Sequence, residues 1–150
     1  MSEKANILVV DDDPSIRKTL TAILEEKGYD VENVETGKEA IRKSKTTFYN
    51  LALIDIRLPD MEGVKLLTKM TETKPKMAKI MITGYPSLQN AVEALNKGAD
   101  AYIIKPFDID KMLATVKDHL DRQHKAQKMN QEQVTEYIET RVRQLEREKR

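Results

Sequence analysis

The sequence predicts an open α/β fold in which five parallel strands alternate with five helices. Five short apolar runs recur along the chain, and a segment with helical spacing follows each of them. Most of the runs are continuous rather than alternating, which is typical of strands that helices cover on both faces. Short loops and right-handed crossovers then favour a doubly wound sheet. The runs occupy residues 7–10, 31–34, 51–54, 80–82 and 101–104.

The first three expected helices follow the first three runs. Pro14 suits the first turn of a helix that ends near Gly28. Thr36 and Glu39 fit a capping box at the start of the second helix. The third helix is expected to follow Gly63. Their apolar positions are Ile16, Leu20, Ile23 and Leu24, then Ala40 and Ile41, then Val64, Leu66, Leu67 and Met70.

The last two expected helices begin with polar caps. Ser87 is suited to cap the fourth helix, which stops at Gly98, and Asp108 is suited to cap the fifth. Their apolar positions are Leu88, Ala91, Val92 and Leu95, then Met112, Leu113, Val116 and Leu120. Five such strands favour the flavodoxin-like order 2-1-3-4-5, in which ligands bind at the carboxyl ends of the first and third strands.

Composition excludes several classes of protein. The absence of cysteine rules out disulfides, thiolate metal sites and cysteine nucleophiles. No apolar run approaches the roughly 18 residues of a membrane-spanning helix, and the polar start is unlike a signal peptide. We therefore expect a cytoplasmic protein with no membrane partner.

Charge and spacing divide the chain into a domain over residues 1–120 and a helical extension or linker over residues 121–150. The first part holds 18 Lys+Arg against 19 Asp+Glu, and the second holds 8 against 6. Neither has the basic excess of a nucleic-acid-binding surface, so no direct nucleic-acid contact is expected. The extension carries one apolar stripe, interrupted toward its start by polar residues. A short coiled coil that forms a homodimer is one interpretation, and a linker to an absent output domain is the other. The stripe consists of Val134, Ile138, Val142 and Leu145.

Side chains with compatible chemistry follow four of the five expected strands. Asp11 and Asp12 follow the first, Asp55 the third, Thr83 the fourth and Lys105 the fifth. Because the carboxyl ends of parallel strands meet at one edge, we expect these side chains to lie close together. Clustered carboxylates repel unless a cation intervenes, and oxygen ligands of this kind suit Mg²⁺.

Together these residues fit a phosphoryl site with a carboxylate nucleophile, a metal and two donors for phosphoryl oxygens. Each residue alone has a more ordinary explanation, because an Asp after a strand is usually a helix cap or a turn residue. Only the conjunction at one sheet edge favours function. Asp13 lies next to Pro14 and is better explained as the cap of the first helix.

Four segments of the chain stand out as a joint pattern: ILVVDDDPSIRKTL (residues 7–20), LALIDIRLPDMEG (51–63), MITGYPS (81–87) and GADAYIIKPF (98–107). They resemble the response-regulator receiver family of two-component signalling, over about residues 5–120 in unbroken order. The resemblance implies that Asp55 is the phospho-acceptor. It also implies that Asp12, Asp55 and the backbone carbonyl of Arg57 bind Mg²⁺, with Asp11 assisting through water. The phosphoryl donor would be a sensor histidine kinase or a phosphotransfer protein.

The resemblance further implies a switch. Thr83 would be the switch hydroxyl, Tyr102 the switch aromatic and Lys105 the lysine that contacts the phosphoryl group, with a cis peptide bond before Pro106. An aspartyl phosphate adds about two negative charges and new acceptor oxygens. Thr83 would move toward them, Tyr102 would turn inward, and the face of the fourth strand, fourth helix and fifth strand would change its protein contacts.

Two rival functions are weaker. A haloacid-dehalogenase-type aspartyl-phosphate hydrolase would use Asp11 and Asp13, but it leaves Asp55 without a role. A nucleotide-binding module would need a glycine-rich loop after the first strand, where none occurs. We therefore expect no enzyme in the usual sense, but a domain that assists only its own phosphorylation and dephosphorylation. As a further hypothesis, Arg57 and Tyr85, each two residues beyond a site residue, flank the entrance and restrict the attacking water.

Overall fold

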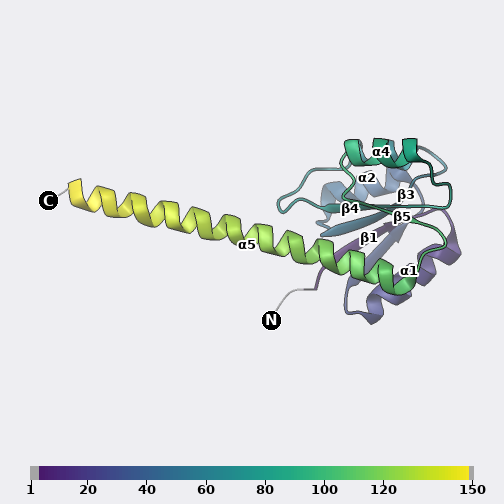
Figure 1. Cartoon of the computed structure of the whole chain (residues 1–150), viewed down its shortest axis with the longest axis horizontal. Coiled ribbons are helices and arrows are strands. Elements are labelled where there is room, and N and C mark those ends of the chain that lie inside the picture. The colour runs from purple at the N-terminus through teal and green to yellow at the C-terminus, as the bar shows by residue number, and fades with distance from the viewer. Residues whose placement is uncertain (1–3, 149–150) are drawn as a thin grey trace.

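The computed structural model describes residues 4–148 and consists of an α/β domain from which one long helix projects (Figure 1). Strands and helices alternate along the chain, as predicted. The strands are β1 (Asn6–Val10), β2 (Asp30–Val34), β3 (Leu51–Asp55), β4 (Ala78–Thr83) and β5 (Ala101–Ile104). The helices are α1 (Pro14–Glu26), α2 (Gly37–Thr46), α3 (Gly63–Lys69), α4 (Leu88–Asn96) and α5 (Ile109–Glu148).

The five strands form one parallel sheet in the order β2-β1-β3-β4-β5, which confirms the predicted topology. The register aligns the carboxyl ends of the inner strands. Val10 pairs with Ile54, and Asp55 pairs with Ile82. Asp11, Asp55 and Thr83 are thus brought to the same edge of the sheet, each within about one residue of a strand end.

Helices cover both faces of the sheet (Figure 1). One buried cluster joins the sheet to α2, α3 and α4, and a second joins it to α1 and α5. Successive residues of β1 alternate between them, since Leu8 belongs to the first cluster and Ile7 to the second. Every residue of β3 and β4 is buried, which explains why residues 51–54 and 80–82 are apolar without alternation. The edge strand β2 buries only Val34, and its sequence is correspondingly more polar.

Polar caps begin the helices where the sequence predicts them. The Asp13 carboxylate accepts hydrogen bonds from the backbone N–H groups of Ser15 and Ile16 at the start of α1. Thr36 caps α2 and Ser87 caps α4 in the same way. Asp13 therefore has the structural role that its position before Pro14 suggests.

Helix α5 runs without interruption for 40 residues, through the predicted domain boundary at residue 120. Its first turns pack on the sheet through Met112 and Val116, while every described side chain from residue 124 onward is exposed. The Gln123 side chain anchors the departing helix, since its amide donates to the carbonyls of Asn50 (2.9 Å) and Lys76 (2.6 Å). Within residues 4–148, no helix combines the length and the apolar character needed to cross a bilayer.

Candidate functional site

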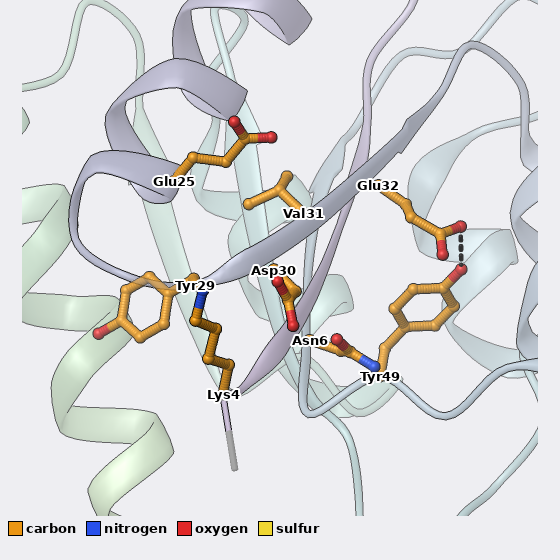
Figure 2. A pocket seen from close by; sticks show the side chains of 8 residues that line it. All are labelled: Lys4, Asn6, Glu25, Tyr29, Asp30, Val31, Glu32 and Tyr49. Carbon is orange, nitrogen blue, oxygen red and sulfur yellow. Dashed lines mark hydrogen bonds between the residues drawn. The ribbon is translucent and has the colours of Figure 1, made fainter. Parts of the chain in front are cut away.

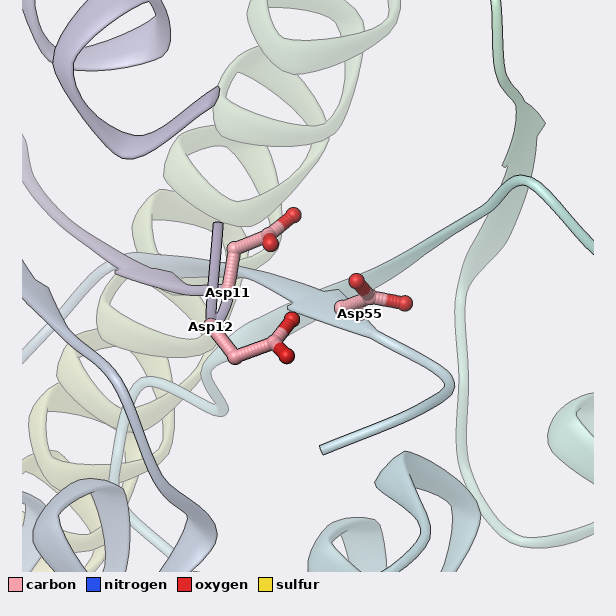
Figure 3. A group of neighbouring side chains, drawn as sticks. All are labelled: Asp11, Asp12 and Asp55. Carbon is pink, nitrogen blue, oxygen red and sulfur yellow. The ribbon is translucent and has the colours of Figure 1, made fainter. Parts of the chain in front are cut away.

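Three carboxylates gather at the carboxyl ends of β1 and β3, as the sequence predicts. One oxygen from each of Asp11, Asp12 and Asp55 lies within 4.8 Å of the other two. Figure 3 shows Asp11 and Asp12 on the segment that leaves β1, and Asp55 at the end of the neighbouring strand. Asp11 and Asp55 are only 2% and 8% exposed, whereas Asp12 faces solvent. We call this cluster of two buried carboxylates and one exposed carboxylate the acidic recess.

Lys105, which follows β5, bridges the two buried carboxylates. Its Nζ donates to Asp11 Oδ2 at 2.9 Å and to Asp55 Oδ2 at 3.2 Å. The other oxygen of each carboxylate accepts a backbone hydrogen bond, Asp11 Oδ1 from Asp13 and Asp55 Oδ1 from Arg57. These bonds fix the orientation of both carboxylates and leave Asp55 Oδ2 facing the ammonium group.

The electrostatics of the recess favour a further cation. Burial raises the pKa of Asp55, and the charge of Asp11 adds to the increase, while the Arg57 N–H and Lys105 oppose it. Burial alone would lower the pKa of Lys105, but its hydrogen bonds and ion pairs with Asp11 and Asp55 raise it above its usual value. When all three carboxylates are ionised, one ammonium group leaves two negative charges uncompensated.

The donor set fits a hard divalent ion. Carboxylate oxygens are preferred ligands of Mg²⁺, and two of its ligands on opposite sides stand about 4.2 Å apart, or twice the usual bond length. The observed limit of 4.8 Å is slightly wider. The residues therefore suit Mg²⁺ in charge, chemistry and approximate spacing.

The other predicted site residues lie around this recess. Thr83 ends β4 fully buried, and its Oγ1 accepts a hydrogen bond from the backbone N–H of Tyr85 at 2.9 Å. Tyr102 on β5 is half-buried and packs against the cluster that contains α4 residues. Among the described residues, nothing pairs with its buried hydroxyl. The Lys105–Pro106 peptide bond is cis, and so is Lys74–Pro75, which the sequence analysis did not single out.

One residue that supports the site could not be predicted from the sequence. Arg17 on α1 donates from Nη1 to the backbone carbonyl of Asp11 at 2.8 Å, and its side chain is only 14% exposed. This bond holds the segment that carries Asp11 and Asp12 against α1. The only signal in the sequence is an arginine one turn into a helix that follows the acidic run, and surface arginines are common at such positions.

A second hollow lies at the opposite end of the sheet, near the amino ends of β1 and β2 (Figure 2). Its volume is about 380 Å³. The Tyr49 hydroxyl donates to Glu32 at 2.8 Å, and Lys43 pairs with the same carboxylate at 3.1 Å. These bonds pair Glu32 and Tyr49 with other protein groups, and no cluster of three carboxylates like that at the ends of β1 and β3 was found here among residues 4–148.

Comparison with known proteins agrees with the geometry. The model of a family described as the response regulator receiver domain matches residues 7–117. A crystal structure of a CheY-like receiver domain protein from Methanospirillum hungatei is 49% identical, with a TM-score of 0.79 over 83% of this chain and 99% of that one. The beryllofluoride-activated NtrC4 receiver domain, solved as a dimer, is 38% identical, with a TM-score of 0.74 over 79% of this chain and 98% of that one.

Full-length relatives are longer. The transcriptional regulatory protein ZraR of Klebsiella oxytoca is 39% identical over 118 residues, which are 79% of this chain and 27% of ZraR. The regulatory protein AtoC of Escherichia coli is 34% identical over 78% of this chain and 25% of AtoC. The chain thus spans about a quarter of the length of these curated relatives.

Proposed function

The chain belongs to the response-regulator receiver family of two-component signalling, and on this premise we propose that Asp55 accepts a phosphoryl group with Mg²⁺ bound beside it. The observation that carries the proposal is the recess in which Asp11, Asp12 and Asp55 converge and Lys105 bridges two of them. Three carboxylates beside one ammonium group leave two excess negative charges, which a divalent cation would balance. The Asp55 carboxylate is held in position by hydrogen bonds from the Arg57 N–H and from Lys105.

Each residue of the recess has a distinct part in this proposal. Asp12, Asp55 and the backbone carbonyl of Arg57 would hold Mg²⁺, with Asp11 acting through a water molecule. The metal would neutralise charge on the phosphoryl oxygens. An oxygen of Asp55 attacks phosphorus, and the phosphorus–nitrogen bond to a donor histidine breaks. The donor is a sensor histidine kinase or a phosphotransfer protein. Lys105, now bound to Asp55 Oδ2, exchanges that carboxylate oxygen for a phosphoryl oxygen.

The switch is proposed to pass from Thr83 to Tyr102. Thr83 Oγ1 accepts the bond from the Tyr85 N–H, and within residues 4–148 no bond donated by this hydroxyl is found. The hydroxyl hydrogen is therefore available to a phosphoryl oxygen. The buried hydroxyl of Tyr102 lacks a partner within residues 4–148, and such a group costs about 1–3 kcal/mol. This cost opposes the buried position of the hydroxyl, so we expect a local event at Thr83 to be able to shift the ring.

The output surface is proposed to be the face of β4, α4 and β5. Several large apolar side chains are exposed there, with Leu88 at 83%, Leu95 at 53% and Ile104 at 50%. Apolar side chains on a charged surface mark a site of protein contact. No contact with nucleic acid is proposed for this chain.

The competing hydrolase is not favoured, because the family match and the named relatives are regulators rather than enzymes. Asp13 also has a structural use as the cap of α1, which removes one of the two carboxylates that the hydrolase would need. The proposal limits any catalysis to phosphorylation and dephosphorylation of Asp55 itself.

Metal binding offers a test of the recess. Replacing Asp12 with asparagine removes a charged ligand, so we expect affinity for Mg²⁺ to fall by at least about tenfold. The matched control is Asp13→Asn, one residue away, because asparagine caps a helix as well as aspartate does. Titration with MgCl₂ followed by NMR chemical shifts measures both. Equal affinities for the two variants would contradict the assignment of Asp12.

We also propose that residues 121–150 pair with a second copy of the chain through a short coiled coil. The stripe of α5 is exposed, with Val134 at 57%, Ile138 at 54%, Val142 at 46% and Leu145 at 45%. A lone polar helix of this kind is marginal in water, and burying the stripe against a partner helix would stabilise it. The NtrC4 receiver, which this chain resembles, forms a dimer when activated.

Analytical sedimentation distinguishes a dimer held by the coiled coil of residues 121–150 from a dimer that forms only on activation. We expect a dimer both with and without beryllofluoride, and a monomer after Ile138→Glu places a charge in the stripe. Thr140→Glu is the matched control, because it adds the same charge about 200° around the helix. A monomer that dimerises only with beryllofluoride would instead assign the contact to the β4–α4–β5 face, and a monomer under every condition would exclude both.

A further inference from the structure

The apolar stripe of α5 lies on the same side of the helix as the residues that pack on the domain. Val134 follows Val116 by 18 residues, which is about five full turns at 3.6 residues per turn. Val116 is fully buried against the sheet. Because α5 is continuous over its whole length, the two side chains leave it in nearly the same direction. One face of α5 thus begins in the core and continues along the part of the helix that projects from the domain (Figure 1).

The spacing of residues along this face repeats every 11 residues. Successive intervals are four, four and three residues, and this pattern occurs three times between Met112 and Leu145. An 11-residue repeat corresponds to about 3.67 residues per turn, close to the value of a straight helix, so the face does not wind to the other side. Its members are Met112, Val116, Leu120, Gln123, Gln127, Gln131, Val134, Ile138, Val142 and Leu145.

A groove opens where this face leaves the domain. Its volume is about 1290 Å³, and it lies between α5 and residues 72–77, which lead into β4. Gln127, Gln131 and Val134 line it from α5, and Pro75 and Met77 line the opposite wall. Since Val134 is the first residue of the stripe, a helix that covers the stripe also comes against the mouth of this groove.

A parallel pair of α5 helices would bring the two domains into collision. With twofold symmetry, the stripe of each parallel helix points toward the symmetry axis. The domain stands on that same side of α5, where it packs on Met112 and Val116. Both domains of a parallel pair would therefore have to fill the space at the axis. An antiparallel pair avoids this overlap, because its domains lie at opposite ends of the paired helices.

We propose that two copies of the chain pair through antiparallel α5 helices, and that the C-terminal part of each helix lies against the groove of the other copy. The inference rests on the coiled coil proposed above and adds its orientation. Apolar residues face one another when Val134 lies opposite Leu145 of the second copy and Ile138 lies opposite Val142 of the second copy. The two Val116 residues are then about 70 Å apart along the pair, too far for the β4–α4–β5 faces of the two copies to meet.

Disulfide trapping tests this orientation, because the chain has no cysteine of its own. Val134→Cys and Leu145→Cys, one of them isotopically labelled, are mixed under reducing conditions, oxidised and analysed by intact mass. A disulfide needs Cα atoms within about 7 Å, so we expect at least about fivefold more mixed dimer than either like dimer. In the antiparallel pair, like positions would be about 16 Å apart along the axis. Thr140→Cys lies on the far side of the helix and is the matched control, which should form little cross-linked dimer with either variant.

The outcomes separate the orientation from the coiled coil itself. If the parent sediments as a monomer, the proposed coiled coil fails and the antiparallel pair fails with it. If the parent is a dimer and each variant cross-links mainly to itself, the coiled coil stands and the orientation is wrong. A dimer in which neither position cross-links would also overturn the proposal. Should either substitution itself prevent pairing, Gln131→Cys mixed with Glu148→Cys leaves the stripe intact, and a short bismaleimide gives the same readout.

Discussion

Replacing Asp55 with asparagine abolishes the uptake of phosphoryl label from acetyl phosphate, with an expected loss of at least about 100-fold. The amide is neutral and a poor nucleophile, whereas phosphoryl transfer to a carboxylate needs an anionic oxygen. The substitution also removes one of the charged groups proposed to hold Mg²⁺ and one of the two ion pairs of Lys105. Label retained on the protein after desalting measures the effect.

Asp13→Asn is the control for this loss, because it makes the same chemical change within the acidic run. Its carboxylate caps α1 and belongs to no metal-binding group found among the described residues. Uptake should therefore match that of the parent. Should Asp55→Asn take up label as readily as Asp13→Asn, Asp55 is not the acceptor.

Gly63→Ala is expected to destabilise the fold by about 2–4 kcal/mol, because it forces backbone to move beneath the site. A Cβ at this position would overlap the carbonyl oxygen of Asp55 and lie 3.0 Å from the Cα of Ile56. The Gly63 N–H also donates to the Ile56 carbonyl at 2.6 Å, which holds the start of α3 against the end of β3. Backbone atoms cannot move aside as a flexible side chain can. The expected loss in free energy of unfolding is therefore at the upper end of the range for overpacked sites.

Gly84→Ala provides the matched control on the neighbouring loop. There the nearest atoms to an added Cβ belong to the Lys105 side chain, 3.9 Å away, which is ordinary contact. We expect a loss below about 1 kcal/mol. Urea unfolding of both variants measures the difference, and equal free energies of unfolding would contradict the close approach of α3 to Asp55.

The fold was predictable because the strands that carry it are buried on both faces. The runs at β3 and β4 are apolar throughout, and their flanking glycines and caps mark where the helices begin and end. Gly28 and Gly98 have φ values of 92° and 109°, a region that disfavours other residues, and they end the helices as predicted. Strand β2 gave a weaker signal, since an edge strand with one buried side chain keeps a polar sequence.

The positions of the site carboxylates were predictable for a related reason. Parallel strands bring the residues that follow them to one edge, so the location of Asp11, Asp12 and Asp55 follows from topology alone. Contacts made by residue types that are common on protein surfaces were harder to predict from the sequence. Neither the bond from Arg17 to the Asp11 carbonyl nor the anchoring of α5 by Gln123 has a spacing that distinguishes it from solvent-exposed polar residues. The inward packing of Tyr102 depends on a rotamer, which its sequence position leaves open.

The most direct test of the central claim locates the phosphoryl group and asks whether it requires the metal. Protein is treated with acetyl phosphate with and without MgCl₂, reduced with borohydride to convert the aspartyl phosphate to homoserine, and mapped by mass spectrometry. We expect the modification at Asp55 and only in the presence of magnesium. Modification at Asp11, or equal modification of Asp55 in excess EDTA, would contradict a site in which acidic side chains hold a divalent ion against the acceptor.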